Sequence, residues 1–81
     1  MTPDPVIIEA RGHRCPVPSL RLRKAMDERP EIAVFVLLAS DPMARIDVPF
    51  LMRELGGRVV SVEETASWLT FTVARRGAPT D

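Results

Sequence analysis

The sequence predicts a two-layer α/β sandwich, in which two helices cover one face of a mixed four-stranded sheet. Short β-branched segments alternate with segments whose apolar residues recur at helical spacing, in the order β-α-β-α-β-β. A short loop separates the last two strand-like segments, which is typical of an antiparallel hairpin. The 81 residues have room for a single domain, residues 1–81, with an ordered core expected at about residues 6–76.

The first strand and the first helix are expected in the N-terminal third of the chain. Residues 6–10 are β-branched and short, and the strand they predict ends at Gly12. A helix is expected to begin at Cys15, with Pro16 in the first helical position, where the backbone N–H has no partner to lose. It should end near Glu28, and its buried face should carry Pro18, Leu22, Ala25 and Met26.

The second strand and the second helix follow the same order. Residues 33–39 show no polar alternation, which indicates a strand at the centre of a sheet or covered on both faces. The run from Ser40 to Pro42 resembles a helix N-cap followed by proline, with Asp41 more suited to capping than to acid catalysis. Pro49 predicts a kink or a break, and residues 56–57, both glycine, close this helix. The expected buried face is Val48, Leu51, Met52 and Leu55.

The last strands are expected at residues 58–64 and 68–73, joined by residues 65–67. Helical connections make sequential strands parallel, whereas the terminal hairpin is antiparallel, so the sheet is expected to be mixed. Residues 1–5 and 77–81 are rich in Pro, Gly and Asp and are expected to fray.

Composition excludes several classes of function. Eleven basic residues balance eleven acidic ones and aromatic residues are sparse, so no nucleic-acid partner is expected. The longest apolar run has eight residues, far short of the ~20 that span a bilayer, so no membrane association is expected. No secretion signal is recognisable and the cytoplasm is the expected compartment. One Cys and one His do not form a zinc cage, and neither a metal nor another cofactor is expected.

The position of the only cysteine is the most informative feature of the chain. Cys15 lies between the first strand and the first helix, at the sheet edge where α/β folds often carry ligand chemistry. A helix N-terminus favours thiolate, so a lowered pKa is expected, with the Val17 N–H as the nearest donor on a rigid, exposed turn. The other interpretation is a buried cysteine that acts as a small hydrophobe. Basic residues should favour thiolate as well, namely Arg11, Arg14, Arg21, Arg23, Lys24 and Arg29.

His13 lies two residues before Cys15 and could activate it as a base. The alternative is an exposed loop histidine without a catalytic role, since no third residue that would orient the ring is identifiable.

Two segments carry a resemblance to a known family. Cys15-Pro16-Val17-Pro18, preceded by Arg11-Gly12, together with the segment from Asp41 to Pro49, resembles the signature of the TusA/SirA-like sulfur-carrier family. The resemblance implies the sandwich fold and a sulfurtransferase role in which Cys15 carries a persulfide. It maps Cys15 onto the carrier cysteine, Pro16 and Pro18 onto the motif prolines, and Arg11 and Gly12 onto the loop before them.

The resemblance also implies partners. A cysteine desulfurase or another persulfide donor would load Cys15, and a downstream acceptor protein would take the sulfur, for example toward thiolated tRNA or other sulfur metabolism. Val17 and His13 differ from the residues frequent in the tRNA branch, and both, with Arg14, are expected to touch the partner. A monomer is expected, because a carrier needs its cysteine face free.

Two other functions remain open at this point. One is a non-catalytic module that binds RNA or protein, by analogy with a related fold in a translation initiation factor. The other is a thiol redox sensor, in which peroxide oxidises Cys15. The lack of a second cysteine argues against a thioredoxin-like oxidoreductase, because Cys15 has no resolving partner within the chain.

Overall fold

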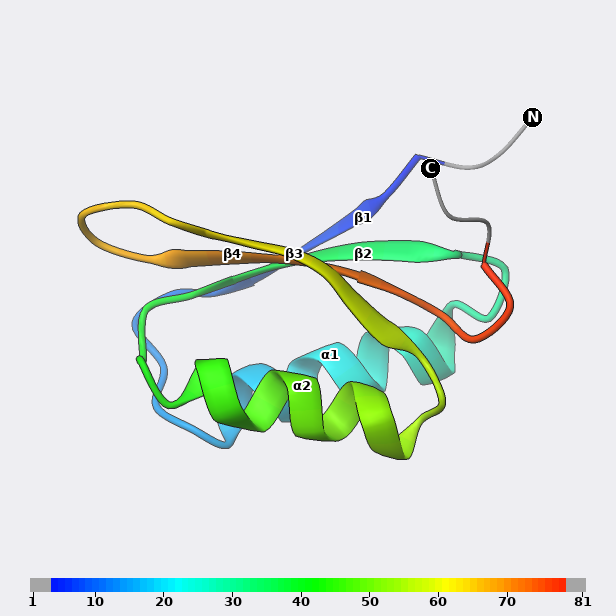
Figure 1. Cartoon of the computed structure of the whole chain (residues 1–81), viewed down its shortest axis with the longest axis horizontal. Coiled ribbons are helices and arrows are strands. Elements are labelled where there is room, and N and C mark those ends of the chain that lie inside the picture. Colours follow the sequence, from blue (N-terminus) through cyan, green and yellow to red (C-terminus); the bar gives the residue numbers. More distant parts are fainter. Residues whose placement is uncertain (1–3, 79–81) are drawn as a thin grey trace.

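A computed structural model describes residues 4–78 and confirms the predicted α/β sandwich (Figure 1). Fraying is expected for residues 1–5 and 77–81. Of these, residues 1–3 and 79–81 lie outside the described residues. The elements in chain order are β1 (Val6–Ala10), α1 (Val17–Glu28), β2 (Val34–Ala39), α2 (Ala44–Glu54), β3 (Arg58–Glu64) and β4 (Leu69–Ala74).

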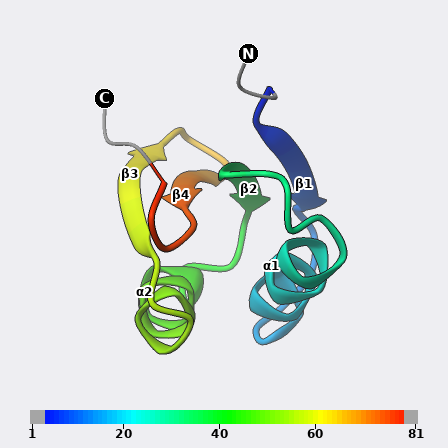
Figure 2. The same ribbon diagram turned by 90° about the vertical axis from the view of Figure 1, so that its right-hand side faces the viewer.

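The four strands form one mixed sheet in the order β1-β2-β4-β3. β1 pairs parallel with β2, and β4 pairs antiparallel with both β2 and β3. The apolar strand β2 therefore lies inside the sheet, as its lack of polar alternation predicts. Both helices lie on the same face of the sheet, side by side (Figure 2).

One hydrophobic core fills the space between the sheet and the helices. The sheet contributes alternate residues, with Phe35, Leu37 and Phe71 fully buried. The predicted helix faces point into this core, although Ala25 and Leu55 are only partly buried. The fully buried helical side chains include Leu22, Val48 and Met52.

The boundaries of four elements differ from the prediction. β2 begins at Val34, one residue later than expected. α1 begins at Val17 with Pro16 as its N-cap, so the expected start at Cys15 is wrong. α2 begins at Ala44, because residues 42–43 form a turn before the helix. α2 continues through Pro49, since the burial of its apolar face outweighs one lost backbone hydrogen bond. β4 lies one residue later than expected.

Three loops meet at one end of the molecule, on the left in Figure 1. They are the β1–α1 loop, the β2–α2 loop and the β3–β4 hairpin turn. Both helices begin at this end, because each one follows a parallel strand. The cysteine of the β1–α1 loop is thereby placed beside residues that are distant in the sequence.

Candidate functional site

The β1–α1 loop is tied to the β2–α2 loop by two hydrogen bonds. The Gly12 N–H donates to Ser40 Oγ at 2.8 Å, and the Cys15 N–H donates to Asp41 Oδ2 at 2.9 Å. Gly12 has a φ of 87°, which suits glycine and turns the chain after β1. Cys15 is therefore held against the start of α2 rather than standing on an isolated turn.

Asp41 uses both of its carboxylate oxygens in this arrangement. While Oδ2 accepts from Cys15, Oδ1 accepts from the Met43 N–H at 2.9 Å. These hydrogen bonds, with the nearby charge of Arg14, hold the pKa of Asp41 below its ordinary value. Asp41 thus caps the turn before α2, although the helix begins at Ala44 rather than at Pro42, and it also anchors the Cys15 loop.

Cys15 is half-buried and packs against the hydrophobic core. The prediction of an exposed turn around Cys15 is therefore wrong in part, since the core covers one side of the residue. The predicted donor is engaged elsewhere: the Val17 N–H donates to the Arg14 carbonyl at 2.9 Å. Among the residues that the structure describes, no side chain forms a capping hydrogen bond at the N-terminus of α1.

The surroundings of Cys15 raise the pKa of its thiol to about 12. Burial is the largest cause, followed by a hydrogen bond to the Asp47 carboxylate and by the negative charges of Asp47 and Asp41. The predicted lowering of this pKa is wrong, because burial and the carboxylates of Asp47 and Asp41 favour the neutral thiol. The resting thiol is protonated at neutral pH.

Several of the basic residues expected around the sulfur interact with other groups. Arg11 forms an ion pair with Glu9 at 2.6 Å, and its guanidinium lies 4.8 Å from the centre of the Trp68 ring. Arg21 donates to the Glu9 carbonyl at 2.8 Å. Arg11 and Arg21 are therefore engaged with β1 and with the hairpin, and neither is among the groups that shift the pKa of Cys15.

His13 and Arg14 are exposed in the β1–α1 loop. The backbone N–H of His13 donates to the Ala10 carbonyl at 3.3 Å. Within residues 4–78, no hydrogen bond joins the His13 imidazole to Cys15. The geometry thus gives no support to a Cys-His pair.

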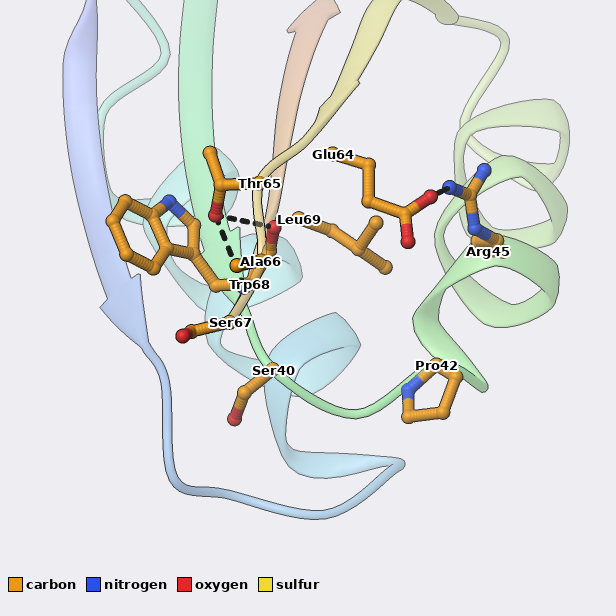
Figure 3. Close-up of a pocket in the computed structure, with 9 residues that line it drawn as sticks. All are labelled: Ser40, Pro42, Arg45, Glu64, Thr65, Ala66, Ser67, Trp68 and Leu69. Atoms are coloured by element: carbon orange, nitrogen blue, oxygen red, sulfur yellow. Dashed lines mark hydrogen bonds and ion pairs between the residues drawn. The ribbon is translucent and has the colours of Figure 1, made fainter.

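Two adjoining hollows open at the end of the molecule that carries Cys15. One has a volume of about 300 Å³ and lies between the loop residues Gly12, His13 and Arg14 and the β2–α2 loop. The other, of about 190 Å³, lies between the β2–α2 loop and the hairpin turn, where Arg45 and Glu64 form an ion pair (Figure 3). Ser40 and Pro42 line both hollows.

Sequence reasoning did not single out Ser40, Arg45, Glu64 or Trp68 as residues near the site. They come from three separate parts of the chain and no local pattern marks them. Asp47 lies inside the segment from Asp41 to Pro49 that carries the family resemblance, and its effect on Cys15 depends on how α1 and α2 pack.

Within residues 4–78, no three His, Cys, Asp or Glu side chains are grouped so that they could hold a metal ion. None of the helices in that range is long and apolar enough to cross a membrane.

The fold and the site define a small α/β domain with one cysteine at the loop end of its sheet. Residues 6–75 match the family described as Sulfurtransferase TusA, and the chain belongs to that family. A protein of Archaeoglobus fulgidus, provisionally named a sulfur carrier protein, is 39% identical over 57 residues, which cover 70% of this chain and 74% of the relative. Sulfur carrier protein TusA of Pseudomonas putida is 27% identical over 75 residues, covering 93% and 92%.

Proposed function

We propose that this protein is a sulfur carrier, which accepts a sulfur atom on Cys15 as a persulfide and passes it to a partner protein. The observation that carries the proposal is the family match, which covers residues 6–75 and includes Cys15. The names of the two relatives support the same role. Cys15 is half-buried beside the loop residues Gly12, His13 and Arg14, which line one of the open hollows at this end of the molecule.

The proposed transfer is an exchange at sulfur. The Cys15 sulfur attacks the outer sulfur of a donor persulfide, the donor's S–S bond breaks, and the donor cysteine leaves as a thiol. The same exchange, with Cys15 now as donor, delivers the sulfur to an acceptor cysteine. Because Cys15 is the only cysteine in the chain, its persulfide does not collapse to an internal disulfide.

We propose a cysteine desulfurase as donor and a thiol-bearing protein as acceptor, for example in a relay that leads to thiolated tRNA. Arg11, Gly12, His13, Arg14, Pro16 and Val17 surround Cys15 and would form the contact surface, whereas the motif proline Pro18 is buried against the core and would not touch a partner. The protein would act as a monomer in the cytoplasm, where reducing conditions keep a lone thiol unpaired.

The test is to incubate the protein with a cysteine desulfurase and free cysteine and to weigh it intact. We expect a mass gain of one sulfur atom that dithiothreitol reverses, and no gain in Cys15→Ser. The proposal fails if the unmodified protein gains no sulfur, or if Cys15→Ser gains the same mass.

A redox sensor makes a different prediction from the same cysteine. A thiol with a raised pKa reacts slowly with peroxide, because the thiolate is the reactive form. Rapid peroxide oxidation of Cys15 without sulfur loading would favour the sensor over the carrier.

A further inference from the structure

The larger of the two hollows, of about 300 Å³, separates the loop that carries the sulfur from the β2–α2 loop. Its lining is Gly12, His13 and Arg14 on one wall and Ser40, Asp41 and Pro42 on the other. The volume is at the lower end of the range for ligand sites in proteins, which suits a small molecule. What such a molecule contributes depends on the sulfur-carrier role proposed above, on which this inference rests.

A hydrogen bond limits how far the sulfur lies from this hollow. The Cys15 N–H donates to Asp41 Oδ2 at 2.9 Å, and Asp41 belongs to the lining. Three covalent bonds separate the Cys15 nitrogen from Sγ, so the sulfur lies within about 7 Å of that oxygen in any rotamer. A molecule bound to Asp41 by one end can therefore reach Sγ with a reactive group about 5 Å further along.

The two walls of the hollow carry opposite charges. Arg14 is exposed, and within residues 4–78 no hydrogen bond or ion pair engages its guanidinium. Asp41 is ionised at neutral pH, because two backbone N–H groups and the charge of Arg14 lower its pKa. A carboxylate offers about four lone-pair positions, so Asp41 can accept hydrogen bonds beyond these two.

An α-amino acid carries the complementary pair of charges on a single carbon atom. Its carboxylate would face the Arg14 guanidinium and the hydroxyl of Ser40, whose side chain points toward the β1–α1 loop (Figure 3). The Ser40 Oγ accepts the Gly12 N–H at 2.8 Å, and its O–H can donate to a ligand. The ammonium would donate to Asp41. A simple anion would be repelled by Asp41 and a simple cation by Arg14, so the zwitterion fits best.

We propose that this hollow binds the persulfide of free cysteine, and that this small molecule loads Cys15 directly without a donor protein. Cys15 Sγ forms a bond to the outer sulfur of the bound persulfide, and the S–S bond of the ligand breaks with its electron pair on the inner sulfur. Cys15 releases its thiol proton to solvent and the departing cysteine takes one up, so the step needs no oxidant or reductant. The products are the Cys15 persulfide and free cysteine.

Four small persulfides separate the contributions of the two charges. Cysteine persulfide has both the ammonium and the carboxylate, 3-mercaptopropionate persulfide only the carboxylate, cysteamine persulfide only the ammonium, and 2-mercaptoethanol persulfide neither. The rate at which each probe loads Cys15 is divided by its rate with N-acetylcysteine, which cancels the reactivity of the probe itself. We expect loading by cysteine persulfide to saturate with concentration, and its normalised rate at low concentration to exceed the other three about tenfold.

The matched variants are Arg14→Gln and Arg23→Gln, the second of which removes an exposed charge of α1 outside the hollow. Arg14→Gln should raise the half-saturating concentration of cysteine persulfide about tenfold, since the ligand carboxylate loses a charged donor. It should leave the rate with 2-mercaptoethanol persulfide unchanged. Arg23→Gln should change neither value.

Binding can also be measured apart from sulfur transfer, by NMR titration of isotope-labelled Cys15→Ser. The probe is S-methylthiocysteine, a stable disulfide with the head group of cysteine persulfide. We expect the amide signals of Gly12, Arg14 and Ser40 to shift to saturation. The uncharged hydroxyethyl methyl disulfide should leave them in place.

The outcomes distinguish this inference from the proposed function. Equal normalised rates for the four probes, an unchanged half-saturating concentration in Arg14→Gln, or no saturable shift in the titration overturns the amino-acid site. The carrier function stands in each of those cases if the protein gains sulfur from a desulfurase. Failure to gain sulfur from a desulfurase overturns the carrier function instead, and the titration of Cys15→Ser still decides whether the hollow binds the amino acid.

Discussion

At the residue scale, Asp41 connects the cysteine to the rest of the molecule. Its carboxylate accepts backbone N–H groups from Cys15 and from Met43, two residues that belong to different loops. Hydrogen bonds to an ionised acceptor are shorter and stronger than those between neutral groups. The loop that carries the sulfur is therefore held in place before any partner arrives.

The raised pKa of Cys15 predicts a pH dependence of stability. The thiol titrates near 9 in the unfolded chain and at about 12 in the folded protein. Below pH 9 both states are protonated and the contribution is fully present. Between pH 9 and 12 the unfolded chain loses its proton first, so stability falls as pH rises.

Urea denaturation at pH 8, 9, 10 and 11 measures this effect, with Cys15→Ser as the reference, since serine does not titrate in this range. We expect the urea midpoint of the unmodified protein to fall more steeply above pH 9 than that of Cys15→Ser. Parallel curves would show that the folded thiol is not protected from ionisation.

At the element scale, the end of α1 depends on a residue of the C-terminal segment. Arg75 donates from Nε to the Ile32 carbonyl at 2.8 Å and from one Nη to the Met26 and Arg29 carbonyls at 3.0 and 2.9 Å. Its guanidinium also lies 5.6 Å from the centre of the Phe35 ring. One planar cation thus binds two carbonyls at the C-terminal end of α1, those of Met26 and Arg29, and one carbonyl of the loop that leads to β2.

Substitution of Arg75 should therefore destabilise the fold. We expect Arg75→Ala to lower the free energy of unfolding by about 2–3 kcal/mol, because three carbonyls lose a partly buried charged donor. Arg75→Lys should lose less, since it keeps the charge but not the planar fork. The neighbouring exposed Arg76→Ala is the control and should stay within about 0.5 kcal/mol in urea denaturation. An equal loss in Arg76→Ala would contradict this assignment.

At the scale of the whole molecule, the helices cover only one face of the sheet (Figure 2). Small domains bury roughly 60% of the surface that the unfolded chain exposes, so stability depends on few side chains. Phe71 lies on an interior strand with no exposure, whereas Phe50 on α2 is 59% exposed. The same residue type therefore occurs in two opposite environments.

This contrast gives a matched pair of substitutions. Phe71→Ala should cost about 3–5 kcal/mol, because it removes a buried ring and leaves a cavity. Phe50→Ala should change stability by no more than about 0.5 kcal/mol, since its ring contributes little to the core. Thermal and urea unfolding of both variants measure the difference. Similar losses would mean that the ring of Phe50 is buried in solution.

Much of the fold is determined by the sequence alone. The bounds of β1 and β3 agree with the prediction, and the helical apolar faces point into the core as their spacing indicates. The alternation of apolar and polar residues in strands and the helical spacing of apolar residues are local consequences of backbone geometry, so they can be recognised without a structure. The family resemblance rested on short segments around Cys15 and Asp41, and residues 6–75 match that family.

The protonation state of the cysteine was decided only by the tertiary structure. From the sequence, the helix N-terminus and neighbouring arginines predict a thiolate, but folding brings Asp41 and Asp47 to the sulfur and partly buries it. Arg11 instead forms an ion pair with Glu9, and its guanidinium lies over the Trp68 ring. Electrostatic and desolvation effects depend on distance in space, and residues far apart in the chain set that distance only once the helices pack.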